Sequence, residues 1–194
     1  MAVDFSKNAT IVARELLGKT LVRTLDDGTV LKGIIVETEA YSGTDDLASH
    51  GRAKKTPRNI IMYGPPGYIY VYLIYGMYQM LNIIAEPEDE PAAILIRAVE
   101  PMSGIDVMKK LRGKDNVKNL CNGPGKLAQA FDIDKSLNGL SLGSEIQILD
   151  GVEVPISSIE TSPRIGLGKS VQEPWLSKPW RWYIRDNPFV SRLN

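Results

Sequence analysis

Two acidic side chains and one arginine lie in segments whose other residues are typical of buried strands. In the run IIVETEAY, residues 34–41, strand alternation places Glu37, Glu39 and Tyr41 on one face. Arg97 lies in the run AAILIRAV, which contains no other polar residue. An unpaired buried charge is very costly, so Arg97 needs an anionic partner, and Glu39 or Glu37 is the candidate. The pattern predicts either an ion pair that joins two strands or a carboxylate that is set up for chemistry.

A tyrosine-rich run and two isolated polar residues form a second candidate group. The run YIYVYLIYGMY carries five tyrosines in eleven residues, with Tyr72 on a strand and Tyr75 near the following turn. Tyrosine is a good strand former, so sheet packing is one interpretation, and a wedge that enters DNA is the other for Tyr75. Asn82 places an amide in a buried strand, where it needs hydrogen-bond partners. His50, the only histidine, is either an ordinary loop residue or a catalytic group.

The residue inventory excludes several kinds of chemistry. One histidine and one cysteine are too few for a zinc site, which draws mostly on these ligands, so no metal is expected. The motifs GxSxG, GxGxxG and the P-loop are absent from the sequence, so acyl transfer and nucleotide cofactors have no local support. Cys121 cannot form an internal disulfide and is expected to be a small buried residue. We therefore expect an activity without a cofactor.

The distribution of charge says more about partners than the sum does. The chain has 23 basic and 23 acidic residues, and a net charge of zero argues against nucleic-acid binding. However, the segment Gly51–Tyr63 has four cations and no acid, and Lys109–Lys118 has five cations and one acid. The acids concentrate in the segment 86–90. Each basic stretch is either a solvated face or a surface for phosphates.

Hydrophobic periodicity predicts the elements that must position these residues. The sequence predicts a single domain over residues 1–194, of the α+β class, with a curved, mostly antiparallel sheet, a protruding β-hairpin and peripheral helices. Asp27-Gly28 and Gly76-Met77 mark the two hairpin turns. Helices are predicted over residues 7–17, 103–113 and 126–131, and strands over 20–25, 29–41, 68–75, 78–84 and 92–101, with further short strands within 142–167.

The sequence shows no signal for a membrane or for secretion. No apolar run approaches the roughly 20 residues of a membrane helix, and the first residues lack the pattern of a secretion signal. A cytoplasmic location, at the nucleoid in a bacterium, is therefore expected.

Taken together, the motifs resemble the alkyladenine (3-methyladenine) DNA glycosylase family over almost the whole chain. They are VETEAY, DLASHGRAKKTPRN, YVYLIYGMYQMLNI, LIRAVEP, LCNGPGKLAQAFDIDK, SPRIGL and KPWRWYIRDNPFVS. The resemblance implies a monomeric enzyme that flips an alkylated or deaminated purine out of duplex DNA. The expected lesions are 3-methyladenine, 7-methylguanine, hypoxanthine and ethenoadenine. Hydrolysis of the N-glycosidic bond would leave an abasic site, without metal, cofactor or lyase activity.

The resemblance also implies a role for each matching residue. Glu39 is similar to the general base that activates water, and Arg97 to its partner. The other expected positions are Tyr41, His50 and Tyr72 in the base pocket, Asn82 against the 2-amino group of guanine, Tyr75 as the intercalating wedge, and Lys126 and Lys135 at phosphates. Arg58, in the basic segment 51–63, is a further expected phosphate contact. A purine methylated at N3 or N7 is positively charged, so stacking between Tyr41 and Tyr72 would favour it by about 1–2 kcal/mol.

Three alternatives remain at this point. A non-catalytic lesion-binding module would keep the tyrosines and the basic segments without needing Glu39 beside Arg97. A hydrolase of free nucleosides would need no wedge. A glycosidase that uses Glu37 and Glu39 as acid and nucleophile is less favoured, because alternate residues of one strand stand about 6–7 Å apart.

Overall fold

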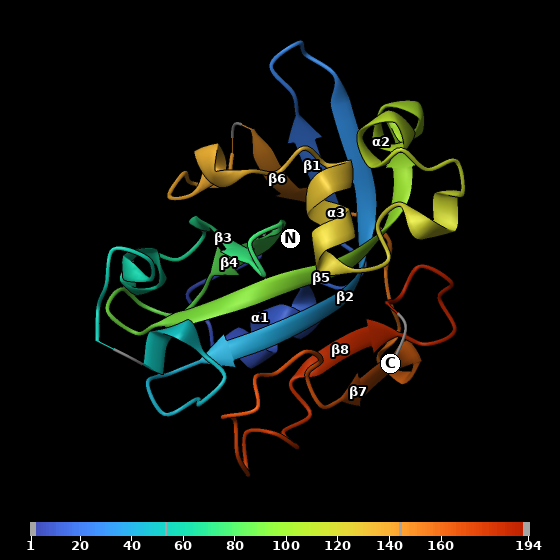
Figure 1. The fold of residues 1–194 in the computed structure, drawn as a ribbon. Coiled ribbons are helices and arrows are strands. Elements are labelled where there is room, and N and C mark those ends of the chain that lie inside the picture. The colour runs from blue at the N-terminus through green and yellow to red at the C-terminus, as the bar shows by residue number, and fades with distance from the viewer. Residues whose placement is uncertain (1–2, 53, 144, 192–194) are drawn as a thin grey trace.

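A curved antiparallel sheet organises the chain (Figure 1). The computed structural model describes residues 3–191 apart from 53 and 144. Within these residues, eight strands pair in the order β3-β4-β5-β2-β1-β6, and β8 pairs with both β2 and β7. The strands are β1 (Thr20–Thr24), β2 (Val30–Ser42), β3 (Ile69–Ile74), β4 (Tyr78–Ile84), β5 (Ala92–Ser103), β6 (Ile146–Leu149), β7 (Ile159–Ser162) and β8 (Arg181–Ile184).

The long strand β2 is the centre of this arrangement. One of its edges pairs with β5, and the two run side by side across the middle of the molecule (Figure 1). The other edge is shared: the first part of β2 pairs with β1, and residues 37–39 pair with β8. The pairing of β2 with β5 shifts register on both sides of Glu37. Such a bulge bends a strand and redirects its side chains. It lies at Glu37, close to Glu39, and both of these carboxylates contact Arg97.

Three α-helices lie around the sheet among the described residues. They are α1 (Ala9–Glu15), α2 (Ile105–Arg112) and α3 (Pro124–Ala130). Asn8 caps α1 by accepting a hydrogen bond from the backbone N–H of Thr10. The buried side of α1 packs on β2, where the Thr38 hydroxyl donates to the carbonyl of Ala13 over 2.8 Å. Helix α3 packs against β4 and β5, which places its first turn near Arg97.

The structure confirms the predicted α+β class and most of the predicted elements. The predicted strand over residues 78–84 coincides with β4, and the predicted helix over 7–17 is shortened to α1. Strand β5 runs on to Ser103, so α2 begins two residues later than predicted. Strand β8 was not predicted. Cys121 is buried in the main core, where burial raises the pKa of its thiol to about 12.

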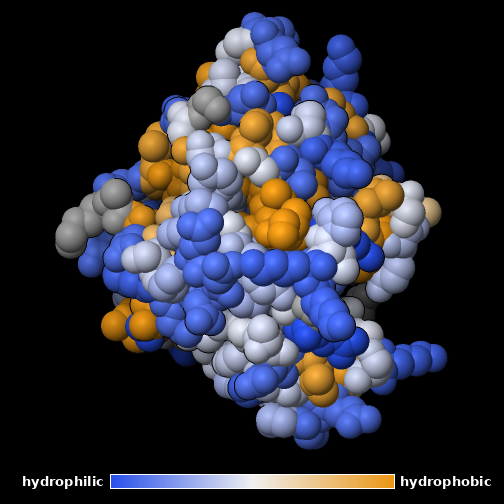
Figure 2. Space-filling model, turned by 90° about the vertical axis from the view of Figure 1, so that its left-hand side faces the viewer, coloured by the Kyte–Doolittle hydropathy of each residue, from blue (hydrophilic) through white to orange (hydrophobic). Residues whose placement is uncertain are grey.

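The acidic loop that follows β4 contacts both the basic segment 51–63 and the start of α1. Lys55 forms an ion pair with Asp89 over 2.5 Å. In the same loop, Glu86 accepts hydrogen bonds from the side chain of Asn8 and the backbone N–H of Ala9, and so holds the start of α1. Parts of this acidic loop therefore have structural contacts. The left-hand side of Figure 1 is mostly hydrophilic, with hydrophobic residues in separate groups (Figure 2).

Candidate active site

Glu39 is a fully buried carboxylate with donors on both of its oxygens. Its Oε1 accepts from the backbone N–H of Ile165 over 2.7 Å and lies 3.1 Å from Nη1 of Arg97. Its Oε2 accepts from the hydroxyl of Tyr41 over 2.8 Å. Burial and the Glu39 charge raise the pKa of Tyr41, so its hydroxyl keeps the proton that it donates. These contacts hold Glu39 in one orientation.

Arg97 joins Glu39 to the second carboxylate, Glu37. The Nε of Arg97 donates to Oε1 of Glu37 over 2.7 Å. Burial opposes the charge of Arg97, but Glu39 and Glu37 outweigh that effect and raise its pKa, so the guanidinium stays charged. The ion pair expected from the sequence is therefore present, and it includes both carboxylates.

Glu37 is the more heavily engaged of the two carboxylates. It also accepts from Nε of Arg181 over 2.6 Å, and from the backbone N–H and hydroxyl of Ser191 over 2.7 and 2.8 Å. Burial raises the pKa of Glu37, but Arg97 and Arg181 outweigh it and lower the pKa overall. A carboxylate held ionised in this way cannot act as a general acid. The geometry thus argues against the glycosidase alternative and fits a role in holding Arg97.

An aromatic pocket lies beside this buried pair. The cavity between its walls measures about 20 Å³ and opens to solvent. The rings of His50 and Tyr72 meet edge to face with centroids 4.6 Å apart, and Tyr70 lies 5.4 Å from Tyr72. The pocket therefore brings together the four residues expected there. Its lining comprises Tyr41, Ala48, His50, Met62, Tyr70, Tyr72, Asn82 and Ala93.

His50 is held as a neutral ring at the edge of the pocket. Its Nδ1 lies 3.0 Å from the hydroxyl of Tyr70, and its backbone carbonyl accepts from the Asn59 side chain over 2.8 Å. Burial lowers the pKa of His50, and the charges of Arg58 and Arg52 lower it further. The ring is therefore uncharged at neutral pH.

Asn82 has hydrogen-bond partners in the buried strand β4, as its position required. Its Nδ2 donates to the carbonyls of Tyr70 and Met80 over 3.1 and 3.2 Å. The amino group is thus engaged by the backbone, and Oδ1 is the atom left for contacts in the pocket.

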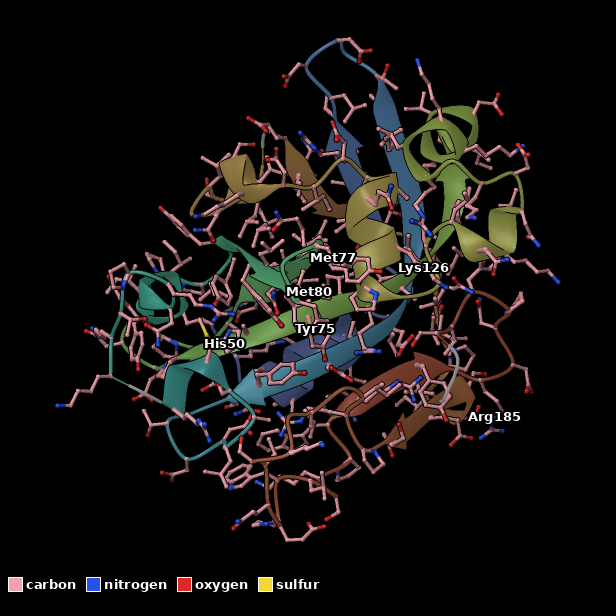
Figure 3. The ribbon with its side chains drawn as sticks, viewed as in Figure 1. His50, Tyr75, Met77, Met80, Lys126 and Arg185 are labelled. Atoms are coloured by element: carbon pink, nitrogen blue, oxygen red, sulfur yellow. The ribbon has the colours of Figure 1, made fainter. Side chains whose placement is uncertain are left out.

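Tyr75 lies at the tip of the β3–β4 hairpin. It is 75% exposed and has a φ of 52°, an uncommon conformation for a bulky residue. Its neighbours Leu73, Met77 and Tyr78 are also exposed, so the tip is an apolar projection. In Figure 3, Tyr75 lies in the middle of the view between His50 and Lys126, whereas Arg185 lies apart, near β8.

The three cations expected at phosphates lie in different surroundings. Lys126, in the first turn of α3, donates to Oδ1 of Asn122 over 2.9 Å and lines a polar recess together with Arg97. Lys135 begins a short 3-10 helix, Lys135–Leu137, and lines neither this recess nor the aromatic pocket. The guanidinium carbon of Arg58 lies 6.0 Å from the centre of the Tyr72 ring, at the pocket itself.

Several site residues were not found from the sequence. Arg164 forms a buried two-point ion pair with Asp46 over 2.6 and 2.9 Å, and its guanidinium carbon lies 4.7 Å from the centre of the Tyr41 ring. The other three site residues contact Glu39 or Glu37 from the C-terminal part of the chain, and they are Ile165, Arg181 and Ser191. The motif SPRIGL, which contains Arg164 and Ile165, was the available signal.

Neither a metal site nor a membrane-spanning helix is present among the described residues. No group of three or more histidine, cysteine or acidic side chains is placed to hold a metal ion in this part of the chain. Within the same residues, no helix is both long and apolar enough to cross a membrane.

Comparison with known proteins identifies a family match over nearly the whole chain. The family model "Methylpurine-DNA glycosylase (MPG)" matches residues 3–188. Three relatives carry the name "Putative 3-methyladenine DNA glycosylase". The protein from Prosthecochloris aestuarii is 49% identical over 98% of this chain and 89% of its own length. Those from Methanocella arvoryzae and Clostridium perfringens are 45% and 44% identical, each over 97% of this chain, and over 94% and 96% of their own lengths.

Proposed function

Because this chain belongs to the methylpurine-DNA glycosylase family, we propose that it hydrolyses the N-glycosidic bond of damaged purines with water activated by Glu39. Family membership makes it a DNA glycosylase of DNA repair. The proposed substrates are 3-methyladenine, 7-methylguanine, hypoxanthine and ethenoadenine, flipped out of duplex DNA. The observation that carries the mechanism is the contact of buried Glu39 with Arg97 at the edge of an aromatic pocket.

The hydrogen bonds of Glu39 leave one position for water. Two carboxylate oxygens offer about four lone-pair sites, and three are taken by Ile165, Arg97 and Tyr41. The open site is on Oε2, which among the described residues accepts only from Tyr41. A water molecule bound there can give its proton to Glu39 while its oxygen attacks C1′ of the deoxyribose. The carboxylate also stabilises the positive charge that develops on the sugar.

The electron pair of the broken C–N bond leaves with the purine. The products are the free base and an abasic site. Glu39 then releases the water's proton to the departing base when a neutral purine leaves as an anion, and to solvent when a positively charged purine leaves as a neutral base. We propose a monofunctional enzyme, because an alternative through a Schiff base needs a lysine at the reacting carbon. Among the described residues that line the aromatic pocket there is no lysine.

The aromatic pocket provides the contacts for a flipped base. We propose that Tyr41 and Tyr72 stack on the purine with His50 at its edge, and that Asn82 occupies the space that the 2-amino group of guanine would need. Tyr75 would fill the gap left in the duplex, since an exposed aromatic side chain at a hairpin tip can enter a base stack.

The remaining contacts of the proposal concern the DNA backbone. Lys126 and Lys135 are proposed to contact phosphates, and Lys126 shares a polar recess with Arg97 beside the catalytic pair. Because its substrate is chromosomal DNA, we place the enzyme in the cytoplasm, at the nucleoid in a bacterial cell. We expect it to act as a monomer on double-stranded DNA.

Base release from a panel of duplexes tests the proposal directly. Each duplex carries one hypoxanthine, ethenoadenine or 7-methylguanine, and alkaline cleavage of the product strand reports abasic sites. Release from at least one of them, lost in the Glu39→Gln variant, is the expected result. Tight binding without release would instead indicate a lesion-binding module. Equal activity on free nucleosides would indicate a nucleoside hydrolase.

A further inference from the structure

Two arginines border the aromatic pocket, one against each of its proposed stacking walls. Arg164 lies 4.7 Å from the centre of the Tyr41 ring, and Arg58 lies 6.0 Å from that of Tyr72. Their charges are not equally free. Arg164 is fully buried in its ion pair with Asp46, which offsets its charge. Arg58 is exposed, and no ion pair within the described part of the chain joins it to a carboxylate.

The charge of Arg58 acts on the interior of the pocket as well as on its rim. It lowers the pKa of His50, adding to the effect of burial. Burial raises the pKa of Tyr70 to about 12, and Arg58 opposes that rise. Together with the contact to the Tyr72 ring, these effects place a positive potential on three residues that line the pocket.

A fixed positive charge treats the two classes of lesion differently. A purine methylated at N3 or N7 enters the pocket with a positive charge and leaves as a neutral base. Hypoxanthine and ethenoadenine enter neutral and leave with the electron pair of the C–N bond, so negative charge develops on the ring. A nearby cation repels the first class in the bound state and stabilises the transition state of the second.

We propose that Arg58 is a specificity-determining residue that shifts the enzyme from positively charged alkylated purines toward neutral purine lesions. The inference rests on the proposed function, because it assumes that the aromatic pocket receives the purine. It changes the expectation that the tyrosine walls alone favour cationic bases. An arginine already lies against each tyrosine wall and interacts with the negative potential of its ring. Less of that potential is then left to attract a positively charged base.

The test compares Arg58→Gln with two controls on duplexes that carry one hypoxanthine or one 7-methylguanine. Arg58→Lys keeps the positive charge. Lys54→Gln removes a charge from an exposed neighbour in the same basic segment, for which no contact with a pocket ring is found in the described structure. Single-turnover rates below saturation report kcat/KM, which compares free substrate with the transition state, and equilibrium binding to each duplex reports the bound state.

Arg58→Gln is expected to lower kcat/KM on hypoxanthine about tenfold, the order of effect of one nearby charge at a partly exposed site. Its kcat/KM on 7-methylguanine should change little, because tighter binding of the positively charged base is offset by a slower chemical step. Its affinity for the 7-methylguanine duplex should rise relative to the hypoxanthine duplex. Arg58→Lys and Lys54→Gln should keep the parental ratio of the two rates.

An equal loss on both duplexes in Arg58→Gln, with a weaker dependence of binding on salt, would show that Arg58 contacts a phosphate and would overturn the inference. So would an unchanged ratio of rates in a variant that melts like the parent. If the parent released neither base, the proposed function itself would fail, which is a different result from an unchanged ratio.

Discussion

Replacing Glu39 with glutamine separates the catalytic role of this carboxylate from its structural one. The amide oxygen of glutamine can take the place of Oε1 and accept from Ile165 and Arg97. The amide nitrogen then lies at the Oε2 position and donates to the hydroxyl of Tyr41, which turns from donor to acceptor. All the hydrogen bonds are thus kept in the variant. The lone pair that was open to water is lost, because an amide nitrogen cannot accept a proton.

The expected magnitudes follow from these contacts. Loss of the general base should slow the chemical step by about 10²- to 10⁴-fold, or about 2.7–5.5 kcal/mol of activation free energy. The free energy of unfolding should fall by only about 1–3 kcal/mol, because Arg97 keeps its 2.7 Å contact with Glu37. Affinity for a lesion duplex should stay near the parental value, since stacking and phosphate contacts are unchanged.

Glu37→Gln is the matched control, because it removes a second buried carboxylate that touches the same arginine. Glu37 accepts from both Arg97 and Arg181, so this change leaves two buried guanidinium groups with weaker partners. It should cost about 3–5 kcal/mol of stability, or about 6–20 °C in Tm for a domain of this size. We therefore expect Glu37→Gln to be the unstable variant and Glu39→Gln to be the inactive one.

The assay combines single-turnover base release, duplex binding and thermal melting on the same preparations. A Glu39→Gln protein that folds, binds the lesion duplex and releases no base supports the assignment of the general base. A folded Glu39→Gln protein that still excises at near the parental rate would refute it. Early melting of Glu39→Gln together with poor binding would show that the ion pair with Arg97 is mainly structural.

The remaining predictions concern the wedge, the guanine filter and the absence of covalent chemistry. Tyr75→Ser should slow excision from duplex DNA at least about tenfold more than from single-stranded DNA, because the side chain holds an opened duplex; equal losses would show that it only packs. Asn82→Ser should release more guanine, as the 2-amino group gains space; a folded variant with parental guanine release would contradict this role. Excision should survive a metal chelator, and borohydride should trap no protein–DNA adduct, because no Schiff base forms; a trapped adduct would disprove the monofunctional mechanism.

Local patterns were enough to predict much of the fold and part of the candidate site. Strand alternation and the cost of an isolated buried charge predicted that Arg97 would pair with Glu37 or Glu39, and the structure contains both contacts. The α+β class and the strand over residues 78–84 were also predicted, because they depend on hydrophobic periods of a few residues. The DNA glycosylase family was recognised from the order of its motifs.

The hydrogen-bond partners that make the surroundings of Glu37 differ from those of Glu39 could not be predicted from local sequence patterns. Arg181 and Ile165 lie 144 and 126 residues further along the chain than the carboxylates they contact, so only folding brings them together. Strand β8 is four residues long and has no clear period, so its pairing with β2 gave no signal in the sequence. Arg58 was predicted as a phosphate contact within a basic segment, and its position 6.0 Å from the centre of the Tyr72 ring depends on the packing of that segment against β3. Types and spacing of residues limit which groups can react, but the contacts that tune those groups are long-range and form only in the folded protein.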